Sequence, residues 1–275
     1  MYPEISIIMS AYNEPEKYLR ESIESILNQT FKDFEFIIIL DNPNNVKAER
    51  IIKEYQKKDK RIVFIKNEKN LGLAGSLNNG LDIAKGKYIA RMDADDIALP
   101  ERLEKQYKYM ENNKNIDLLF SWVYFIDENG NILKEFKPSK EKIKNLSKYF
   151  FKEHLLVHPT LMAKSEILKK NKYDENQKRS QDFELWMRLI TKGYKFDIIE
   201  EFLLKYRVLK ENYRSRIKKQ IEYSKYSLKA LWKHKKYYWK NIYYWNNFLW
   251  HFSIFLSIKI VPKKILTILI KLKGR

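Results

Sequence analysis

Short runs of β-branched and aromatic residues alternate with longer segments that carry one apolar face throughout the first hundred residues. Residues 5–9, 34–40, 61–65 and 87–91 have the composition of strands that are buried on both faces of a parallel sheet. The segments between them place apolar residues at helical spacing, and Pro15 suits a first helical turn. Repeated βα units of this length predict an α/β fold, in which helices cover both faces of a mostly parallel sheet.

Polar side chains gather where the predicted strands end. Tyr12 and Asn13 follow the first strand, Asp41 closes the second, and Asp93 and Asp95 follow the fourth. In open parallel sheets, ligands bind beyond the carboxyl ends of the strands. The sequence therefore predicts a ligand site at this edge of the sheet.

The segment Asp93-Ala94-Asp95 places two carboxylates two residues apart at a strand end. Alternate side chains of an extended chain point the same way, so both carboxylates can face one ligand. Paired carboxylate oxygens suit Mg²⁺ or Mn²⁺, ions that often bridge substrate phosphates. The alternative interpretation is structural, because acidic pairs are common in loops and Asp96 with Pro100 can cap a helix.

Several motifs in ordered succession resemble those of the family 2 glycosyltransferases. They lie at residues 5–13, at the Asp41 turn, at 70–74 and in the stretch 79–96. The likeness is close over residues 4–110, and it reappears at His158-Pro159-Thr160 and at residues 181–186. The resemblance implies the GT-A nucleotide-sugar fold and an inverting transfer of a sugar from a nucleoside-diphosphate sugar, expected to be a UDP-sugar.

The resemblance also implies roles for individual residues. Asp93 and Asp95 would hold Mn²⁺ or Mg²⁺, and Asp182 would be the general base that activates the acceptor hydroxyl. Contacts with the nucleotide sugar are expected from Ala11, Tyr12, Asn13, Glu14, Asp41, Asn70, Asp93, Ala94 and Asp95. The acceptor pocket is expected to be shaped by His158, Gln181, Glu184 and Trp186.

These roles have structural alternatives. Asp182 can be an acid in the first turn of an amphipathic helix, Tyr12 can be a packing residue, and His158 can be a buried structural histidine. The chain also departs from the family pattern: Asp41-Asn42-Pro43-Asn44 replaces a glycine-containing turn, and Gln181-Asp182 replaces Glu-Asp. The departures leave a pseudoenzyme that binds nucleotide sugars as an alternative.

The positive charge of the chain is concentrated near its C-terminal end. The formal net charge is +19, yet residues 205–275 hold 19 Lys and Arg against two acids, Glu211 and Glu222. This segment also holds 15 aromatic residues, whereas the rest of the chain is nearly neutral. We therefore divide the chain into a nucleotide-sugar-binding half (1–100), an acceptor-binding half (101–205) and a helical basic aromatic tail (206–275).

The tail contains an uncharged stretch at residues 241–258 that is interrupted by Asn, His and Ser. A spanning helix needs about 20 predominantly apolar residues, so this stretch spans a bilayer poorly. Trp, Phe and Leu at helical spacing beside lysines are typical of helices that lie in a membrane interface. The alternatives are a helical cap on the body, a dimer interface or a nucleic-acid surface.

Absence of cysteine excludes a disulfide scaffold, a Cys-ligated metal and a cysteine nucleophile, and fits a reducing compartment. Taken together, the sequence predicts a metal-dependent glycosyltransferase of bacterial surface-glycan type, active in lipopolysaccharide or capsule biosynthesis. Its partners would be a nucleotide-sugar donor, a glycan or lipid-linked acceptor, and the anionic inner face of the cell membrane. The rival nucleic-acid-binding protein gives no reason for Asp93 and Asp95, so no nucleic-acid partner is expected.

Overall fold

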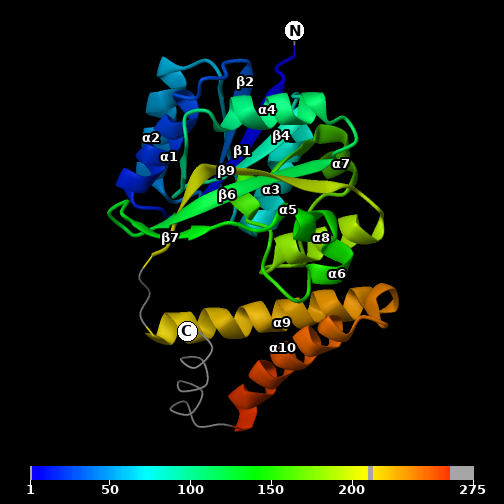
Figure 1. The fold of residues 1–275 in the computed structure, drawn as a ribbon. Coiled ribbons are helices and arrows are strands. Elements are labelled where there is room, and N and C mark those ends of the chain that lie inside the picture. Colours follow the sequence, from blue (N-terminus) through cyan, green and yellow to red (C-terminus); the bar gives the residue numbers. More distant parts are fainter. Residues whose placement is uncertain (1, 210–212, 261–275) are drawn as a thin grey trace.

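The chain folds around one nine-stranded sheet with helices on both faces, and two long helices lie beneath it (Figure 1). The structure is a computed structural model, and it describes residues 2–209 and 213–260. The strand order is β3-β2-β1-β4-β8-β6-β9-β5, with β7 paired to β6. The predicted α/β fold with a mostly parallel central sheet is confirmed.

The N-terminal half of the sheet is entirely parallel. It consists of β3 (Ile62–Lys66), β2 (Phe34–Leu40), β1 (Ile5–Ala11) and β4 (Tyr88–Asp93). These bounds agree with the predicted strands to within two residues, because each run is apolar on both faces. The connecting helices are α1 (Glu16–Leu27), α2 (Val46–Lys58) and α3 (Gly72–Ile83).

Alternate residues of β1 enter two separate cores. Ile7 belongs to a cluster with Leu19 of α1 and Ile51 of α2, whereas Ile8 packs with Leu77 of α3 on the opposite face. Burial on both faces explains why these strands are continuously apolar. It also leaves only the strand ends for polar groups.

Beyond β4 the sheet becomes mixed. The strand β8 (Met162–Lys164) is antiparallel to both β4 and β6 (Leu118–Ile126), and β7 (Ile132–Phe136) is antiparallel to β6. The strand β9 (Phe196–Arg207) runs parallel to β6 and antiparallel to β5 (Ile97–Ala98). The helices of this half are α4 (Arg102–Asn112), α5 (Lys140–Lys144), α6 (Leu146–Tyr149), the 3₁₀ helix η1 (His158–Thr160), α7 (Ser165–Lys170) and α8 (Gln181–Thr191).

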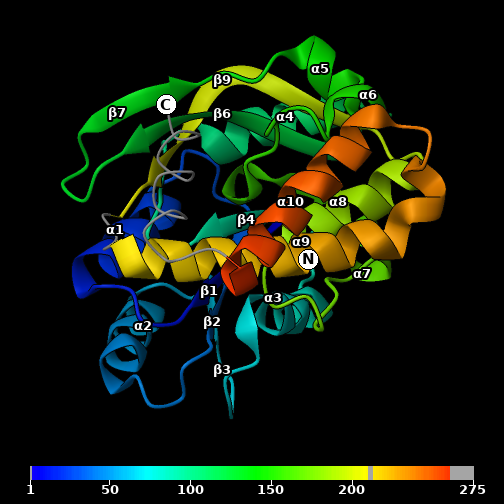
Figure 2. The same ribbon diagram turned by 90° about the horizontal axis from the view of Figure 1, so that it is seen from below.

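Within residues 213–260 the basic aromatic tail forms two helices, α9 (Tyr213–Tyr238) and α10 (Ile242–Ile260), which we call the C-terminal hairpin. The helices pack on each other and on α8, and their common core consists of Phe151, Met187, Ala230, Leu231, Tyr238 and Tyr244. Figure 2, viewed from below, shows α9 crossing beneath the sheet. Of the alternatives for the tail, the structure therefore shows a helical cap on the body.

The apolar face predicted for residues 245–256 is divided between two environments. Trp245 and Phe248 pack against the hairpin core, whereas Leu249, Phe252 and Leu256 are exposed. The lysines at 263–275, which the membrane-interface interpretation places next to this face, lie outside the described residues. Within residues 2–209 and 213–260, none of the helices combines the length and apolar character that crossing a membrane requires.

Candidate active site

A cleft of about 1150 Å³ lies at the carboxyl ends of β1 and β4. Its walls come from the strand ends, the loop before α3, the segments around η1 and before α8, and helix α9. The predicted site residues that line it are Tyr12, Glu14, Asp41, Asn70, Asp93, Ala94, Asp95, His158, Gln181 and Asp182. The structure thus brings together residues that are far apart in the sequence.

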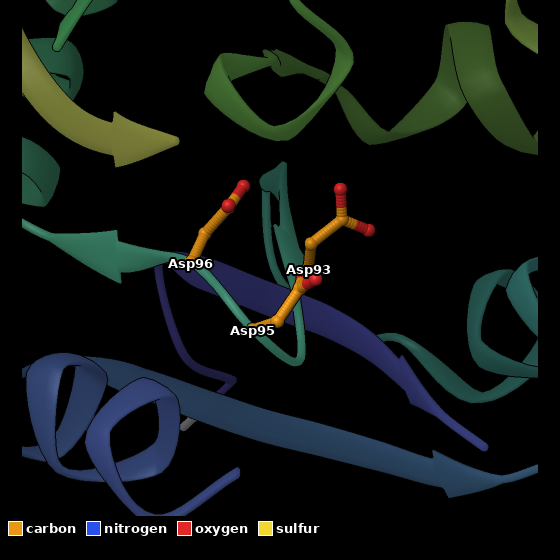
Figure 3. Close-up of side chains that lie close together, drawn as sticks. All are labelled: Asp93, Asp95 and Asp96. Atoms are coloured by element: carbon orange, nitrogen blue, oxygen red, sulfur yellow. The ribbon is translucent and has the colours of Figure 1, made fainter. Parts of the chain in front are cut away.

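Three carboxylates surround the turn that follows β4 (Figure 3). Asp93, Asp95 and Asp96 each offer an oxygen, and these atoms all lie within 4.8 Å of one another. Both oxygens of Asp93 accept hydrogen bonds from the guanidinium of Arg91, which is buried. Asp95 lines the cleft without such a partner among the described cations.

Asp96 lies behind the other two acids. Its side chain is buried, and Oδ1 accepts a hydrogen bond of 2.8 Å from the backbone N–H of Arg207. Oδ2 is buried and has no hydrogen-bond partner among the described residues. The sequence interpretation of Asp96 as a possible cap missed this acidic third member, although the run of acids at 93–96 signals it.

Burial and neighbouring negative charge raise the pKa values of three acids at this site. Burial, reinforced by the charges of Asp93 and Glu14, raises the pKa of Asp95 to about 6. The pKa of Glu14 is raised by burial and by Asp93, and that of Asp96 is raised well above its usual range by burial and by its two acidic neighbours. Carboxylates crowded in this way favour a bound cation, because it compensates their charge. Their hard oxygen atoms fit Mg²⁺ or Mn²⁺.

Asp41 uses its carboxylate to organise the neighbouring loop. Oδ1 accepts hydrogen bonds from Asn67 Nδ2 and from the N–H of Leu71, both at 2.8 Å, and Oδ2 accepts one of 2.9 Å from the N–H of Gly72. Gly72 has a φ of +75°, a conformation that glycine adopts easily. Asp41 therefore shapes the wall that carries Asn70, in addition to lining the cleft itself.

The unusual turn after β2 supports the loop that follows β1. Asn42 Nδ2 donates to Asn13 Oδ1 at 2.7 Å, and Asn45 Nδ2 donates to the carbonyl of Tyr12 at 2.9 Å. Asn13 and the fully buried Ala11 do not line the cleft. The loop presents Tyr12 and Glu14 instead, and the amide side chains of Asn42 and Asn45 hold it in place.

Asp182 lies in the first turn of α8 and lines the cleft with Gln181. Its Oδ1 accepts a hydrogen bond of 2.9 Å from the N–H of Phe183. The helix begins after Ser180, which has a left-handed φ of 53°. The carboxylate of Asp182 thus reaches the cleft from the N-terminal turn of α8.

His158 lines the cleft but is mostly buried, and its Nε2 lies 2.7 Å from the hydroxyl of Tyr173. Burial and the nearby charge of Arg91 hold the pKa of His158 well below its usual value. The imidazole is therefore neutral at pH 7. This arrangement combines the two interpretations of the sequence, a buried histidine and a cleft residue.

Glu184 and Trp186 lie behind the cleft, and the structure does not bring them to its wall. Trp186 packs edge-on against Phe120 and Phe196 in the core. Glu184 is fully buried and pairs with cations of α8 and α9. Both were predicted to shape the acceptor pocket, but they lie on different sides of α8 away from the cleft: Glu184 faces α9, and Trp186 faces the sheet.

Comparison with known proteins defines the family. The model for glycosyl transferase family 2 matches residues 6–171. This chain belongs to that family. It is 66% identical over 274 residues to an uncharacterized glycosyltransferase of Methanocaldococcus jannaschii, covering 99% of this chain and 94% of that protein. It is 35% identical over 233 residues to the O-antigen biosynthesis glycosyltransferase WbnJ of Escherichia coli, covering 83% and 89%.

Solved glycosyltransferase structures share the fold. Residues 1–349 of S. aureus TarS align with a TM-score of 0.67 at 18% identity, covering 91% of this chain and 72% of that one. The same protein in complex with UDP aligns with a TM-score of 0.59 at 20% identity, covering 82% and 65%. The family, its GT-A fold and glycosyltransferase activity, all predicted from the sequence, are confirmed.

Proposed function

We propose that this family 2 glycosyltransferase moves a sugar, with inversion, from a UDP-sugar to a hydroxyl of a surface-glycan acceptor. The proposal is supported above all by one observation: Asp95 and Asp182 line the same cleft. They come from two separate segments of the chain that both resemble the family. The relatives support the acceptor class: WbnJ is named for O-antigen biosynthesis, and a 30% identical Erwinia amylovora protein for amylovoran biosynthesis. The TarS complexes with UDP and with UDP-GlcNAc support the donor class.

Asp95 would hold the divalent cation, with Asp93 as the second acid of the site. The crowded carboxylates and the unpartnered buried oxygen of Asp96 support this assignment. When bound, Mn²⁺ or Mg²⁺ would supply charge stabilisation to the departing diphosphate. Arg91 orients Asp93 through two hydrogen bonds, so Asp95 remains the freer ligand.

Asp182 would accept the proton of the attacking hydroxyl. The bond from that oxygen to the anomeric carbon forms while the bond to the diphosphate breaks, so a single displacement inverts the centre. Neutral Gln181 beside Asp182 offers an amide to the acceptor in place of a second charge.

The nucleotide would lie against Tyr12, Glu14 and Asn70. Asp41 organises this wall, and behind it Ala11 is buried while the Asn13 side chain accepts a hydrogen bond from Asn42. We retain residues 1–100 as the donor half and 101–205 as the acceptor half. The two share one sheet, since β4 pairs with both β1 and β8.

The C-terminal hairpin would attach the enzyme to the anionic inner face of the cell membrane. Trp232, Trp239 and Leu249 are 57%, 59% and 59% exposed, and Lys235 and Lys236 are exposed beside them. Exposed aromatic groups next to lysines suit a headgroup boundary. Co-flotation with anionic vesicles is the deciding measurement.

Release of nucleoside diphosphate from a panel of UDP- and GDP-sugars, with Mn²⁺ or Mg²⁺, tests the catalytic proposal. We expect Asp95→Ala to lower turnover by roughly 100-fold or more. Asp182→Asn should bind donor normally and lose about 100- to 10,000-fold in transfer. Asp82→Asn on the exposed side of α3 is the matched control and should retain full activity. Metal-independent turnover, or undiminished transfer by either cleft variant, would refute the assigned roles.

A further inference from the structure

Helix α9 forms one wall of the cleft that holds the strand-end acids. Tyr223, Lys225 and Tyr226 line the cleft from a single turn of α9. Lys178 and Arg179, from the loop that precedes α8, line the same cleft. The tail is thus part of the site, and its role extends beyond attachment of the enzyme to a surface.

Free positive charge gathers on the side of the cleft formed by α9 and its neighbours. Lys178 and Lys225 have no ion pair with a carboxylate anywhere in residues 2–209 and 213–260. The Nζ of Lys134 on β7 lies 4.7 Å from the ring centre of Phe125. Arg179, in contrast, is paired with Glu222 at 3.2 Å. The ammonium groups of Lys178 and Lys225 therefore remain to bind an anion on this side of the cleft, which also carries the carboxylate of Glu175.

The loop that carries Lys178 is fastened to α9 by polar contacts. Gln177 Nε2 donates a hydrogen bond of 2.7 Å to the carbonyl of Tyr226. Three residues further on, the hydroxyls of Ser180 and Ser227 lie 3.1 Å apart in a buried position. These contacts hold the ammonium groups of the loop and of α9 on one side of the cleft.

A buried cluster fixes the same wall relative to α8. Lys233 Nζ of α9 lies 2.9 Å from Asp174 Oδ2 and 3.1 Å from Glu184 Oε1. The fully buried Glu184 also contacts His234 of α9 and Arg188 of α8. A buried carboxylate is costly without such partners, so α9 stays joined to the helix that carries Asp182.

We infer that this wall is an acceptor subsite for a phosphate-bearing sugar. The inference rests on the proposed transferase function, in which the donor diphosphate is held at the acidic end of the cleft. The ammonium groups of Lys178 and Lys225 then serve a second phosphate, which they bind as point charges. The rings of Tyr223 and Tyr226 offer apolar faces to the sugar next to it.

Calorimetric titration with decyl diphosphate tests this subsite. The full chain is preloaded with UDP and Mn²⁺, so that the donor end is occupied, and no vesicles are present. The double variant Lys178→Glu/Lys225→Glu should bind decyl diphosphate roughly tenfold or more weakly than the parent chain. Its affinity for UDP should not change, because the substitutions lie on α9 and in the loop before α8 and not at the strand ends.

The double variant Lys235→Glu/Lys236→Glu is the matched control, because it makes the same charge change on α9 outside the cleft. It should bind the probe as the parent does. Decyl glucoside lacks phosphate and should bind equally to the parent and to the variants. A glycerol phosphate oligomer identifies the source of the phosphate: binding of the oligomer indicates a polymer phosphodiester, and binding of decyl diphosphate alone indicates a lipid-linked diphosphate.

Absence of probe binding by the parent, or equal binding by the parent and the Lys178→Glu/Lys225→Glu variant, would overturn the inference. The titration needs no turnover. A chain that binds the probe as expected yet releases no nucleotide from any donor would sink the transferase proposal and leave the anion subsite in place.

Discussion

The N-terminal half of the sheet and the C-terminal hairpin both contribute to the cleft, but they hold their side chains in different ways. In the N-terminal half, β1 and β4 are buried by helices on both faces, so their polar ends are set by the hydrophobic core. The hairpin is buried on one face, and its cleft residues are held by hydrogen bonds and ion pairs between side chains.

The difference separates the two substrates. A donor site built on strand ends is as rigid as the core, which favours shared chemistry across a family. An acceptor wall held by polar side chains can change by surface substitution while the core stays intact. We therefore expect substitutions in the two regions to fail in different ways, by unfolding in the first and by loss of binding in the second.

The largest effect is expected at Gly86, two residues before β4. A Cβ atom at this position would lie 2.7 Å from the carbonyl carbon of Ile5 and closer still to the amide nitrogen of Ser6. Backbone atoms cannot move aside as a flexible side chain can, so Gly86→Ala should destabilise the fold by about 3 kcal/mol. Urea denaturation of the parent and the variant measures this free energy.

Lys85→Ala is the neighbouring control, because the Lys85 side chain is exposed and only its backbone is bonded. Its unfolding free energy should remain within about 0.5 kcal/mol of the parent. If Gly86→Ala has the same unfolding free energy as the parent, the close backbone contact between β1 and the turn at Gly86 does not determine the stability of the donor half.

An intermediate effect is expected on the exposed face of the hairpin. The triple variant Trp232→Ser/Trp239→Ser/Leu249→Ser should weaken binding to anionic vesicles by about tenfold or more, because the apolar area available to the interface is lost. Its unfolding midpoint should change little, since these side chains are exposed. Flotation at fixed lipid concentration measures the bound fraction.

Ile132→Ser/Leu133→Ser on β7 is the matched control, as these side chains are 55% and 58% exposed on another element. This variant should float with vesicles as the parent does. Substitution is a cleaner test than truncation at residue 240, which would also remove the fully buried Tyr244 from the hairpin core. Undiminished flotation of the triple variant would refute the membrane proposal.

The N-terminal half of the sheet could also be predicted better from the sequence than the regions that follow it. The strands and the positions of Asp93 and Asp95 could be predicted because burial on both faces leaves a local signature in the chain. The positions of Glu184 and Trp186 away from the cleft could not, since they depend on how α9 and the sheet pack on two sides of α8. The contribution of Tyr223 to the cleft depends on docking of α9 across the sheet edge, and composition alone indicated only a basic surface.

The smallest effect is expected from His158, in the acceptor half between the two regions. Its folded-state pKa lies well below 6.5, because burial and the charge of Arg91 disfavour the imidazolium. Below pH 6.5 the unfolded chain therefore binds a proton that the folded chain does not. Stability contributed by neutral His158 is fully present above pH 6.5 and is lost as the pH falls towards the folded-state pKa. Between pH 7.5 and 5.5 the loss should be about 1 kcal/mol.

The difference between the parent and His158→Gln isolates this contribution, because the amide retains a hydrogen-bond acceptor for the hydroxyl of Tyr173. Urea denaturation at pH 7.5 and 5.5 should show a smaller decrease in unfolding free energy for His158→Gln than for the parent. His154→Gln, at an exposed histidine of the same cleft, should keep the parent's decrease. Equal decreases in the parent and His158→Gln would mean that the imidazole titrates in the folded chain as it does in water, and that the wall behind the acceptor is open to solvent.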